Sequence, residues 1–442
     1  MDIKTLADAD FRGRTVLVRV DFNVPMSAEG ESPGSAVITS DRRIVQALPT
    51  LQALLAIDGV RLVLLSHLGR PAGKGLEPEY SLAPVAQRLE ELLGRPVTLG
   101  PPEVVGPEAA ARVASLPAGG VLLLENVRFC AAETLPDKAS KNPDKRLTDE
   151  QNATLDAFVA ALASLGDAYV NDAFGTCHRK HASMFGLPKA IASRGQPAVA
   201  GLLVEKEARF LGGAIANPRR PFVAVLGGAK VSDKIPLIEQ LLPKVDHILV
   251  GGAMAYTLLR ARGVALGKSR VEADRVEAMA ALLERAGDKV VLPVDHVVTD
   301  RLELARSASA EEEQAAGGRP SVEVTAGVEI PHDRLGVDIG PLTRALFAQQ
   351  VRSAGLVVWN GPMGVFENPA FAAGTEAVAN ALVDATRGGA VTIVGGGDSA
   401  AAIEDLGLDA QVSHVSTGGG ASLEFLEGRA MPPLQVLVSQ RS

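Results

Sequence analysis

The chain has 442 residues, of which 47% are hydrophobic and 4% aromatic, and its formal net charge is −8 at pH 7. This length exceeds one ordinary core and favours two domains. The acidic balance argues against a nucleic-acid or anionic-membrane surface, although a local basic pocket can still bind an anion. The two cysteines offer no disulfide framework, and we find no export signal and no membrane-spanning apolar run. We therefore expect a cytoplasmic protein.

The first half alternates predicted strands with predicted helices. Short runs of apolar residues predict strands at residues 15–20, 61–66, 121–125 and 168–171. Apolar residues at helical spacing predict helices at residues 41–56, 81–93 and 148–165. The expected N-caps are Thr39 or Ser40, Ser81, and Thr148 with Gln151 at capping-box spacing. Because the strands are apolar throughout, they predict a parallel sheet covered on both faces.

The second half repeats this alternation after an expected inter-domain linker at residues 191–212, where a stretch rich in Pro, Gly and Ala leads into a helical pattern. Strands are predicted at residues 222–226, 247–250, 290–294, 356–359 and 391–394. Helices are predicted at residues 234–242, 253–262, 270–286 and 371–386. The predicted fold class is α/β, with two doubly wound, Rossmann-like parallel-sheet domains at residues 1–190 and 213–429 joined by a hinge helix. Two polar segments, 134–150 and 305–320, are expected to be solvated surface loops.

Basic side chains gather after the predicted strands of the first half. Open α/β sheets bind ligands beyond the carboxyl ends of their strands, so residues in these positions are the informative ones. Each arginine taken alone is more often a surface residue. Together they predict a pocket for a small anion, because the planar guanidinium suits carboxylate and phosphate. The set comprises Arg43, His67, Arg70, Arg128, His178 and Arg179.

Glycine-rich turns follow the predicted strands of the second half. Lys230 and Lys234 stand four residues apart at one such turn, where a bound polyphosphate would offset their repulsion. The run Gly395-Gly396-Gly397-Asp398-Ser399 can be an ordinary strand-to-helix turn or an anion site, and residues 416–422 repeat its design. Residues 360–362 and Glu367 follow another strand, where the base and ribose of a nucleotide could be held.

Three familiar motifs are incomplete in this sequence. Gly267-Lys268-Ser269 ends like a Walker A loop, but the required glycine is one residue late, at Gly263. The first strand leads into Asp21-Phe22-Asn23 rather than Gly-x-Gly-x-x-Gly, which weighs against a dinucleotide-binding dehydrogenase. His178 and His181 have metal-like spacing but lack a matching set of carboxylates or cysteines, so we do not expect zinc.

Taken together and in this order, the motifs resemble those of the phosphoglycerate kinase family over nearly the whole chain. The segments that carry the resemblance are residues 20–25 (Val-Asp-Phe-Asn-Val-Pro), 66–71 (Ser-His-Leu-Gly-Arg-Pro), 171–176 (Asn-Asp-Ala-Phe-Gly-Thr), 359–362 (Trp-Asn-Gly-Pro) and 395–398 (Gly-Gly-Gly-Asp). The resemblance implies reversible, Mg²⁺-dependent phosphoryl transfer between ATP and 3-phosphoglycerate, giving ADP and 1,3-bisphosphoglycerate. It further implies that the first domain binds phosphoglycerate, that the second binds the nucleotide, and that closure about a hinge joins them. A monomer is expected, with residues 430–442 returning to pack on the first domain.

The resemblance also assigns roles to individual residues. The implied phosphoglycerate site comprises Asp21, Phe22, Asn23, Arg43, His67, Leu68, Gly69, Arg70, Arg128, His178 and Arg179. The implied nucleotide site comprises Gly228, Ala229, Lys230, Lys234, Gly252, Gly336, Asn360, Pro362, Glu367, Gly396, Gly397, Asp398 and Ser399. The implied catalytic groups are Arg43, Lys234 and the amides of Gly396 and Gly419. Asp398 is expected on Mg²⁺, largely through the nucleotide.

The chain departs from the family pattern at a few positions. Ser399 stands where the family commonly has Thr, and Cys130 and the segment before Gly336 also differ. A catalytically silent nucleotide-binding scaffold of the same fold is the alternative to an enzyme.

Overall fold

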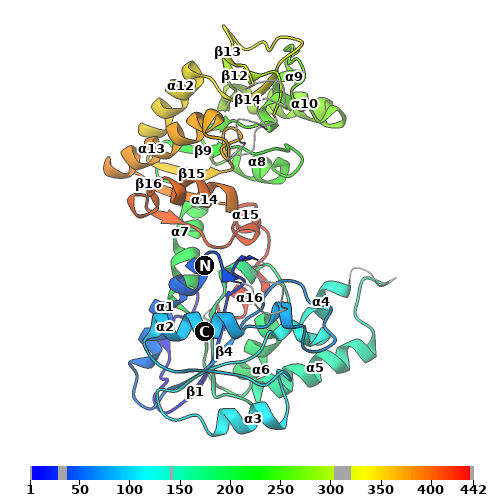
Figure 1. The fold of residues 1–442 in the computed structure, drawn as a ribbon, viewed down its shortest axis with the longest axis vertical. Helices are drawn as coiled ribbons and strands as arrows, with labels where there is room; N and C mark the ends of the chain where they lie inside the picture. The colour runs from blue at the N-terminus through cyan, green and yellow to red at the C-terminus, as the bar shows by residue number, and fades with distance from the viewer. Residues whose placement is uncertain (1, 28–36, 140–141, 143, 303–319, 439–442) are drawn as a thin grey trace, which may run out of the picture. The chain divides into compact units, whose positions relative to one another are not determined.

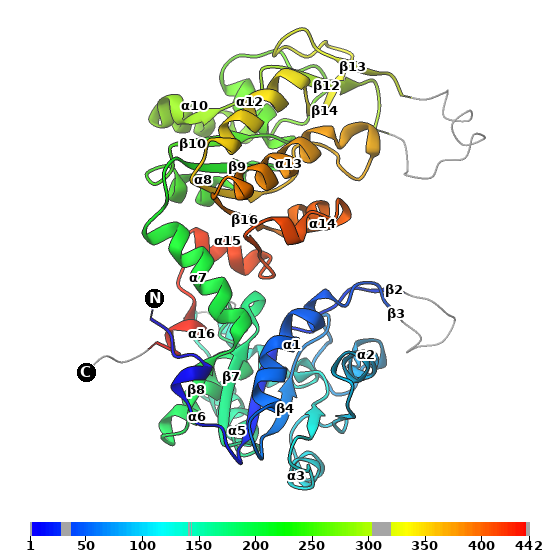
Figure 2. The same ribbon diagram turned by 90° about the vertical axis from the view of Figure 1, so that its left-hand side faces the viewer.

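The computed structural model describes residues 2–27, 37–139, 142, 144–302 and 320–438. The chain divides into two compact units: unit 1 is Met1–Arg209 with Ala430–Ser442, and unit 2 is Phe210–Arg429. Each unit has its own parallel sheet with helices around it (Figures 1 and 2). None of the helices in these ranges has the length and apolar character that spanning a bilayer requires.

Unit 1 is built on a parallel sheet of six strands. Their spatial order is β5 (Val97–Leu99), β6 (Val121–Leu123), β4 (Arg61–Leu65), β1 (Thr15–Val20), β7 (Ala168–Asp172) and β8 (Ala198–Ala200). Val16 of the central strand β1 pairs with Leu62 on one side and Ala168 on the other. Every residue of β1 is buried, as its continuous apolar pattern predicts for a strand covered on both faces.

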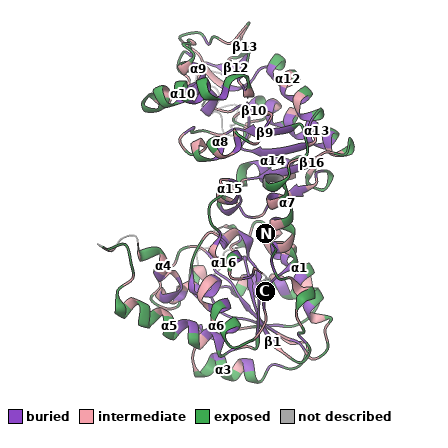
Figure 3. Cartoon of the chain, turned by 180° about the vertical axis from the view of Figure 1, so that it is seen from behind, coloured by how far each residue is buried: buried purple, intermediate pink, exposed green. Residues whose placement is uncertain are grey.

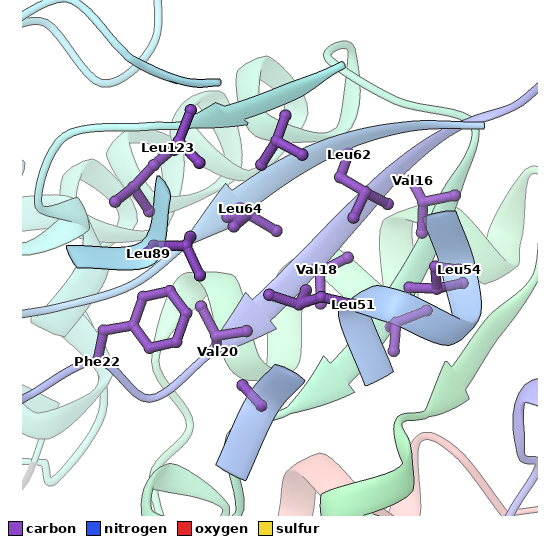
Figure 4. Close-up of a cluster of buried hydrophobic side chains, with 14 of the residues drawn as sticks. Val16, Val18, Val20, Phe22, Leu51, Leu54, Leu62, Leu64, Leu89 and Leu123 are labelled. Carbon is purple, nitrogen blue, oxygen red and sulfur yellow. The ribbon is translucent and has the colours of Figure 1, made fainter. Parts of the chain in front are cut away.

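Helices flank this sheet and contribute to its core. Their bounds are α1 (Arg42–Leu55), α2 (Ala83–Leu93), α3 (Pro107–Ala114), α4 (Leu135–Lys138), α5 (Asp149–Ala163) and α6 (Leu187–Ser193). Figure 4 shows Leu51 and Leu54 of α1 and Leu89 of α2 among the valines of β1 and the leucines of β4. Figure 3 shows the complementary pattern, with exposed residues on the outward sides of the helices. Apolar periodicity in the sequence therefore selects the buried side.

The helix starts test the expected caps. The capping box at α5 is confirmed, since Thr148 Oγ1 accepts from the Gln151 amide and Gln151 Oε1 accepts from the Thr148 amide. The cap predicted at Thr39 or Ser40 is wrong, because Asp41 occupies the N-cap of α1. The Asp41 carboxylate pairs with Arg88 rather than with the helix amides.

Two expectations about connecting segments also need correction. Residues 134–150 are not wholly a loop, because they contain α4 and the start of α5 and bury Leu135. The stretch expected as a linker from residue 191 includes β8, which pairs with β7 inside the first sheet. The polar segment 305–320 lies outside the described residues, except for Pro320.

Unit 2 contains a second parallel sheet of six strands. Their order is β11 (Val290–Val291), β10 (His247–Val250), β9 (Phe222–Leu226), β15 (Leu356–Asn360), β16 (Val391–Gly395) and β17 (His414–Val415). The helices that accompany it are α7 (Leu202–Ala216), which begins in unit 1, α8 (Ile235–Leu241), α9 (Met254–Ala261), α10 (Val276–Ala286), α12 (Pro341–Arg352), α13 (Ala373–Arg387), α14 (Gly397–Asp405) and α15 (Gly420–Leu426). Trp359 on β15 is fully buried in its core.

A small antiparallel sheet in unit 2 was not anticipated from the sequence. Its order is β13 (Val322–Val324), β12 (His296–Thr299) and β14 (Leu335–Ile339). These strands are short, and β14 contains a glycine and an aspartate, so the usual strand pattern is weak there. The prediction of two parallel, doubly wound sheets describes the main architecture but omits this element.

The C-terminal segment lies beside the N-terminus within unit 1. The Lys4 amide donates to the Leu437 carbonyl at 2.8 Å, and Ile3 forms a β-bridge with Val438. The short helix α16 (Pro432–Gln435) precedes this contact.

Candidate active site

The basic residues of unit 1 lie on loops at one edge of its sheet. Strands β1, β4, β6 and β7 are mutually parallel, so their carboxyl ends point the same way. The loops after these strands supply most of the residues predicted to bind phosphoglycerate, and the start of α1 supplies Arg43.

Asp21 and Arg43 form a close ion pair at this edge. Arg43 Nη1 lies 2.5 Å from Asp21 Oδ2, and the carboxylate is almost fully buried. Burial alone would raise the pKa of Asp21, but the Arg43 guanidinium, with His67 and Arg19 nearby, lowers it to about 2. Asp21 is therefore ionised at neutral pH and fixes the orientation of Arg43.

Gly175 completes this arrangement and was missed as a site residue. A Cβ at this position would lie 2.5 Å from Asp21 Oδ2 and 3.7 Å from Arg43 Nη1. Any side chain here would push the carboxylate away from the guanidinium. The sequence shows only a glycine after β7, and the need for it appears once Asp21 is placed.

Asn23, Gly69 and Arg128 connect three of the strand-end loops. Asn23 Oδ1 accepts a hydrogen bond from the Gly69 amide at 2.8 Å, and Arg128 Nη1 donates to the Gly69 carbonyl at 2.7 Å. Gly69 has a φ of +58°, and a Cβ there would collide with the Tyr80 ring. Burial, together with the Arg19 charge, lowers the pKa of Arg128 to about 10, so the guanidinium stays charged at neutral pH. Three loops are thus held in one rigid arrangement.

His67 is an uncharged member of the basic set. The residue is 5% exposed, and its Nδ1 lies 3.2 Å from Nη2 of the buried Arg19. Burial lowers the pKa of His67 well below its ordinary value, although the Asp21 carboxylate opposes this shift. At neutral pH the imidazole therefore offers hydrogen bonding rather than charge.

The remaining predicted residues of unit 1 differ in their surroundings. Arg70 is exposed. Arg179 lies 3.2 Å from the Asp137 carboxylate of α4, and its Nε donates to His178 Nε2 at 2.9 Å. Phe22 and Leu68 pack in the hydrophobic core, so only their backbone atoms remain for a ligand.

The His178 and His181 side chains each contact a neighbouring charged side chain. His181 Nε2 lies 3.0 Å from the Asp137 carboxylate, and the described residues contain no group of three or more His, Cys, Asp or Glu suited to a metal ion. Asp137, in the segment expected to be a loop, is instead the anionic partner of Arg179 and His181.

Unit 2 brings glycine backbone together at the corresponding edge of its own sheet. The Gly227 amide donates to the Asn360 carbonyl, the Gly228 amide to the Pro362 carbonyl and the Gly252 amide to the Met363 carbonyl, at 2.9 to 3.0 Å. Gly252 has a φ of +65°, and a Cβ there would lie 2.6 Å from the Gly228 nitrogen. These loops pack backbone to backbone, which only glycine permits.

Lys234 and Asn360 form the main side-chain contact of this edge. Lys234 Nζ donates to Asn360 Oδ1, and Asn360 Nδ2 donates to the Gly395 carbonyl at 2.8 Å. Asn360 is buried, so it connects the lysine to the loop after β16 rather than projecting into solvent. Burial lowers the pKa of Lys234, while the carboxylates of Asp233, Asp398 and Glu427 oppose the shift.

The lysine turn differs from its predicted form. Helix α8 begins at Ile235, with Lys234 at the N-cap, rather than at Lys234 itself. Lys230 is exposed on the preceding turn. The two lysines therefore do not share a helix.

Adjacent residues in the loop after β16 differ in exposure and in their contacts. Gly396 has a φ of +90° at the N-cap of α14, and a Cβ there would lie 2.7 Å from Asn360 Nδ2. Gly397 and Asp398 are exposed in the first turn of α14. Ser399 is fully buried, and its Oγ accepts from the Gly361 amide at 2.5 Å. Its hydroxyl supports the turn after β15, which was not anticipated from the sequence.

Other predicted residues of unit 2 lie on separate elements. Gly419 is the N-cap of α15 with a φ of +50°, and Glu367 is exposed after β15. The Gly336 amide on β14 donates to Ser269 Oγ at 2.9 Å, and a Cβ at this position would collide with the Tyr256 hydroxyl.

Glu272 is a further residue that sequence reasoning missed. Its Oε2 accepts from the Val231 and Ser232 amides at 2.6 and 3.1 Å, and its Oε1 accepts from the Ser232 hydroxyl at 2.6 Å. Glu272 therefore fixes the lysine turn. It stood inside a predicted helix over 270–286, whereas α10 begins at Val276, so its role was hidden.

Comparisons with known proteins point to one family. Residues 6–429 match the family model for phosphoglycerate kinase. The chain is 48% identical over 440 residues to the phosphoglycerate kinase of Chlorobium chlorochromatii, covering 99% of this chain and 100% of the relative. It is 49% identical over 441 residues to that of Chloroflexus aggregans, with 99% of each covered.

Solved structures agree with the sequence comparisons. The phosphoglycerate kinase from Coxiella burnetii superposes with a TM-score of 0.78 at 37% identity, and that from Pyrococcus horikoshii with a TM-score of 0.77 at 31% identity. Each comparison covers 98% of both chains.

Proposed function

The chain belongs to the phosphoglycerate kinase family, and we propose that unit 1 binds 3-phosphoglycerate while unit 2 binds the nucleotide. The protein is an enzyme that transfers a phosphoryl group between ATP and 3-phosphoglycerate, giving ADP and 1,3-bisphosphoglycerate. The observation that carries the division of labour is the set of charged guanidinium groups fixed around Asp21, Asn23 and Gly69 at one edge of unit 1.

The unit 1 edge suits a ligand with two anionic ends. Arg43 and Arg128 are held by hydrogen bonds to the protein while retaining further donors. Arg70 and Arg179 add exposed charge, and Asn23 and His67 add neutral polar groups. A phosphate and a carboxylate on one small molecule would satisfy this set of donors. Because a carboxylate is ionised at neutral pH, the acceptor needs no general base.

The unit 2 edge suits a polyphosphate. Helix α14 directs the amides of its first turn outward from Gly396 and Gly397, and an N-terminus of this kind favours anions. Lys230 and Lys234 supply charge from the turn after β9. We assign Gly228, Ala229, Gly252, Gly336, Pro362 and Glu367 to the walls that receive the rest of the nucleotide. Ser399 supports this site through Gly361.

Transfer requires stabilisation of charge on the moving phosphoryl group. Its equatorial oxygens carry negative charge while the attacking and leaving oxygens stand in line. We assign Lys234 and Arg43 to this charge, with the amides of Gly396 and Gly419 as additional donors. Direct transfer needs both substrates to meet, so the proposal includes closure about a hinge when both are bound.

Mg²⁺ fits this assignment through Asp398. Magnesium usually binds one or two carboxylates together with phosphate oxygens and waters, and Asp398 is a single exposed carboxylate in the first turn of α14. The described residues offer no cluster of three acidic, His or Cys ligands. We propose that the nucleotide supplies most of the ligands of the metal. When bound, the ion would neutralise phosphate charge.

A coupled assay tests the proposed function. Purified full-length protein is supplied with ATP, 3-phosphoglycerate and Mg²⁺, and formation of 1,3-bisphosphoglycerate is followed through a coupling enzyme. We expect turnover that requires all three. A protein that binds ADP without turnover would instead be the silent scaffold, and tight binding of NAD would indicate a dehydrogenase. We also propose that the protein is cytoplasmic and monomeric. Sedimentation at working concentration would test the monomeric state.

A further inference from the structure

Arg19 is the most unusual buried residue of unit 1. It is the fifth residue of β1 and fully buried, in a strand whose other residues are apolar except for Thr15. Its neighbours Val18 and Val20 belong to the core beneath α1 and α2, so Arg19 faces the opposite side of the sheet. A guanidinium remains charged when buried, so this position demands a full set of partners.

The hydrogen bonds of Arg19 supply those partners in three directions. Nε donates to Ser183 Oγ at 2.9 Å, Nη1 donates to the Val20 carbonyl, and Nη2 lies 3.2 Å from His67 Nδ1. A guanidinium has donors and no acceptor. His67 Nδ1 must therefore accept, which leaves the proton of the neutral ring on Nε2.

Ser183 and Glu133 fix the other end of this chain. Because Ser183 Oγ accepts from Arg19, its own proton is available, and it lies 2.7 Å from Glu133 Oε1. The Ser183 amide donates to Glu133 Oε2 at 2.9 Å. Glu133 is fully buried, so its carboxylate is the internal counter-charge of Arg19 across one hydroxyl. The direction of every hydrogen bond between Glu133 and His67 is thereby determined.

The surroundings of His67 favour the neutral ring. Burial and the positive charges of Arg19 and Arg128 lower its pKa, with a smaller contribution from His181, and the Asp21 carboxylate opposes them. Within the described part of the chain, no hydrogen bond engages Nε2 of His67. That nitrogen is therefore left for a ligand at the strand-end loops.

We propose that Arg19 is a positioning residue that holds His67 as the neutral Nε2–H tautomer, so that His67 donates a hydrogen bond to an anionic oxygen of the ligand in unit 1. This inference rests on the proposed function for the identity of that ligand, 3-phosphoglycerate. The inference extends the proposed function by assigning one donor atom to His67, and by adding Arg19, Ser183 and Glu133 as the residues that hold His67 in place. A neutral donor recognises the anion without changing charge across the imidazole pH range, so ligand affinity stays independent of His67 titration.

The tautomer can be observed directly by long-range ¹H–¹⁵N NMR on the ¹⁵N-labelled full-length protein. The His67 signals are assigned by their loss in His67→Gln. Between about pH 6 and 8 we expect Nδ1 to resonate as an unprotonated nitrogen and Nε2 as a protonated one, without added ligand. A proton on Nδ1, in either the other tautomer or the imidazolium, overturns the proposal.

Variants test whether Arg19 causes this state. Arg19→Met keeps an unbranched side chain and removes the donors and the charge. We expect the Kd for 3-phosphoglycerate to rise about tenfold or more, the scale of one hydrogen bond involving a charged group, and the Kd for ADP to stay unchanged. The pKa of His67 should rise, so binding should also become tighter as pH falls. Arg19→Lys, which restores the charge and one donor nitrogen, should recover part of the affinity.

Controls separate positioning from a general structural effect. Arg95→Met removes an exposed arginine bonded to the Gly119 carbonyl, and should leave both Kd values and the His67 signals unchanged. Ser183→Ala is the milder variant if Arg19→Met does not fold, and it should shift the His67 signals while retaining ADP binding. Unaltered His67 signals and a loss of affinity that does not vary with pH would overturn the role of Arg19.

The outcome remains distinguishable from failure of the proposed function. The spectrum is recorded without substrate, so an inactive protein with the Nε2–H tautomer would contradict the kinase assignment alone. An active protein with a proton on Nδ1 would contradict only the inference about Arg19.

Discussion

The two units differ in the groups that they place at the carboxyl ends of their parallel strands: charged side chains in unit 1 and glycine backbone in unit 2. In unit 1 the strand-end loops and the start of α1 carry long charged side chains; Arg43 is held by Asp21 and Arg128 by the Gly69 carbonyl. In unit 2 the corresponding loops are glycine backbones packed on one another, and the half-buried Lys234 contributes a cation.

The difference follows from what each surface is proposed to recognise. Guanidinium groups match the separate carboxylate and phosphate of a small acid. Amides at turns and helix starts approach a chain of phosphates more closely than side chains can. Unit 1 must therefore hold side chains in place, whereas unit 2 must keep side chains out.

The largest expected effect concerns Lys234, the charged side chain among the glycine-rich loops of unit 2. Lys234→Ala should lower kcat at least about a hundredfold, the loss typical of one transition-state donor, because no other described side chain donates to Asn360 Oδ1. Steady-state kinetics in the coupled assay measures this. Lys268→Ala, at an exposed lysine, is the control and should be near wild type. Wild-type turnover in Lys234→Ala would mean that backbone alone suffices in unit 2.

The next largest effect is a change in the affinity for one ligand but not for the other, because each unit is proposed to bind a different ligand. Arg128→Ala should raise the Kd for 3-phosphoglycerate by about ten- to a hundredfold, as expected for a hydrogen bond to a charged group, with little change for ADP. Arg43→Ala should also lower kcat, since Arg43 is assigned to the transferred group. Calorimetric titration of each ligand measures the difference. An equal loss for both ligands in Arg128→Ala would contradict the division of labour.

A smaller effect tests the backbone packing of unit 2. Gly252→Ala places a methyl group against the Gly228 nitrogen, and we expect about a tenfold rise in the Kd for ADP, the size of one lost hydrogen bond. Gly263→Ala is the matched control, because Gly263 has a φ of +81° but nothing within 4 Å of its Cβ position. If both variants weaken ADP binding equally, backbone strain rather than close packing is responsible.

The smallest effect at neutral pH concerns the ion pair of unit 1. The pKa of Asp21 falls from 3.8 to about 2 on folding, so its stabilisation is present above about pH 4 and is lost as pH falls toward 2. This shift corresponds to about 2 kcal/mol. Calorimetric unfolding of the full-length protein should therefore show a weaker acid destabilisation in Asp21→Asn than in wild type. Parallel pH curves for the two proteins would show that the pair is not proton-linked.

Much of the architecture was predictable because local patterns and tertiary contacts agree. The apolar run at β1 and the Thr148–Gln151 capping box predict elements that the structure confirms. The antiparallel sheet β13-β12-β14 was not predictable, because its strands have only three to five residues and β14 contains Gly and Asp, so they carry little periodic signal.

The candidate site was likewise predictable only in part. Motif order in the sequence was enough to indicate the family and to place its polar residues after strands. The sequence did not indicate that Ser399 supports Gly361, that Glu272 holds the lysine turn, or that Arg19 contacts His67. These contacts join residues 38 to 48 positions apart, and no local pattern marks such a pair.

The alternation of strands and helices and the chemical types of residue at each strand end can be predicted from the residue order, because both depend on local patterns along the chain. Which polar groups bind one another, and which remain for a ligand, depends on the three-dimensional fold. Burial imposes this dependence: once Arg19, Asp21 and Asn360 leave water, each must find its partners among residues that the fold brings to it.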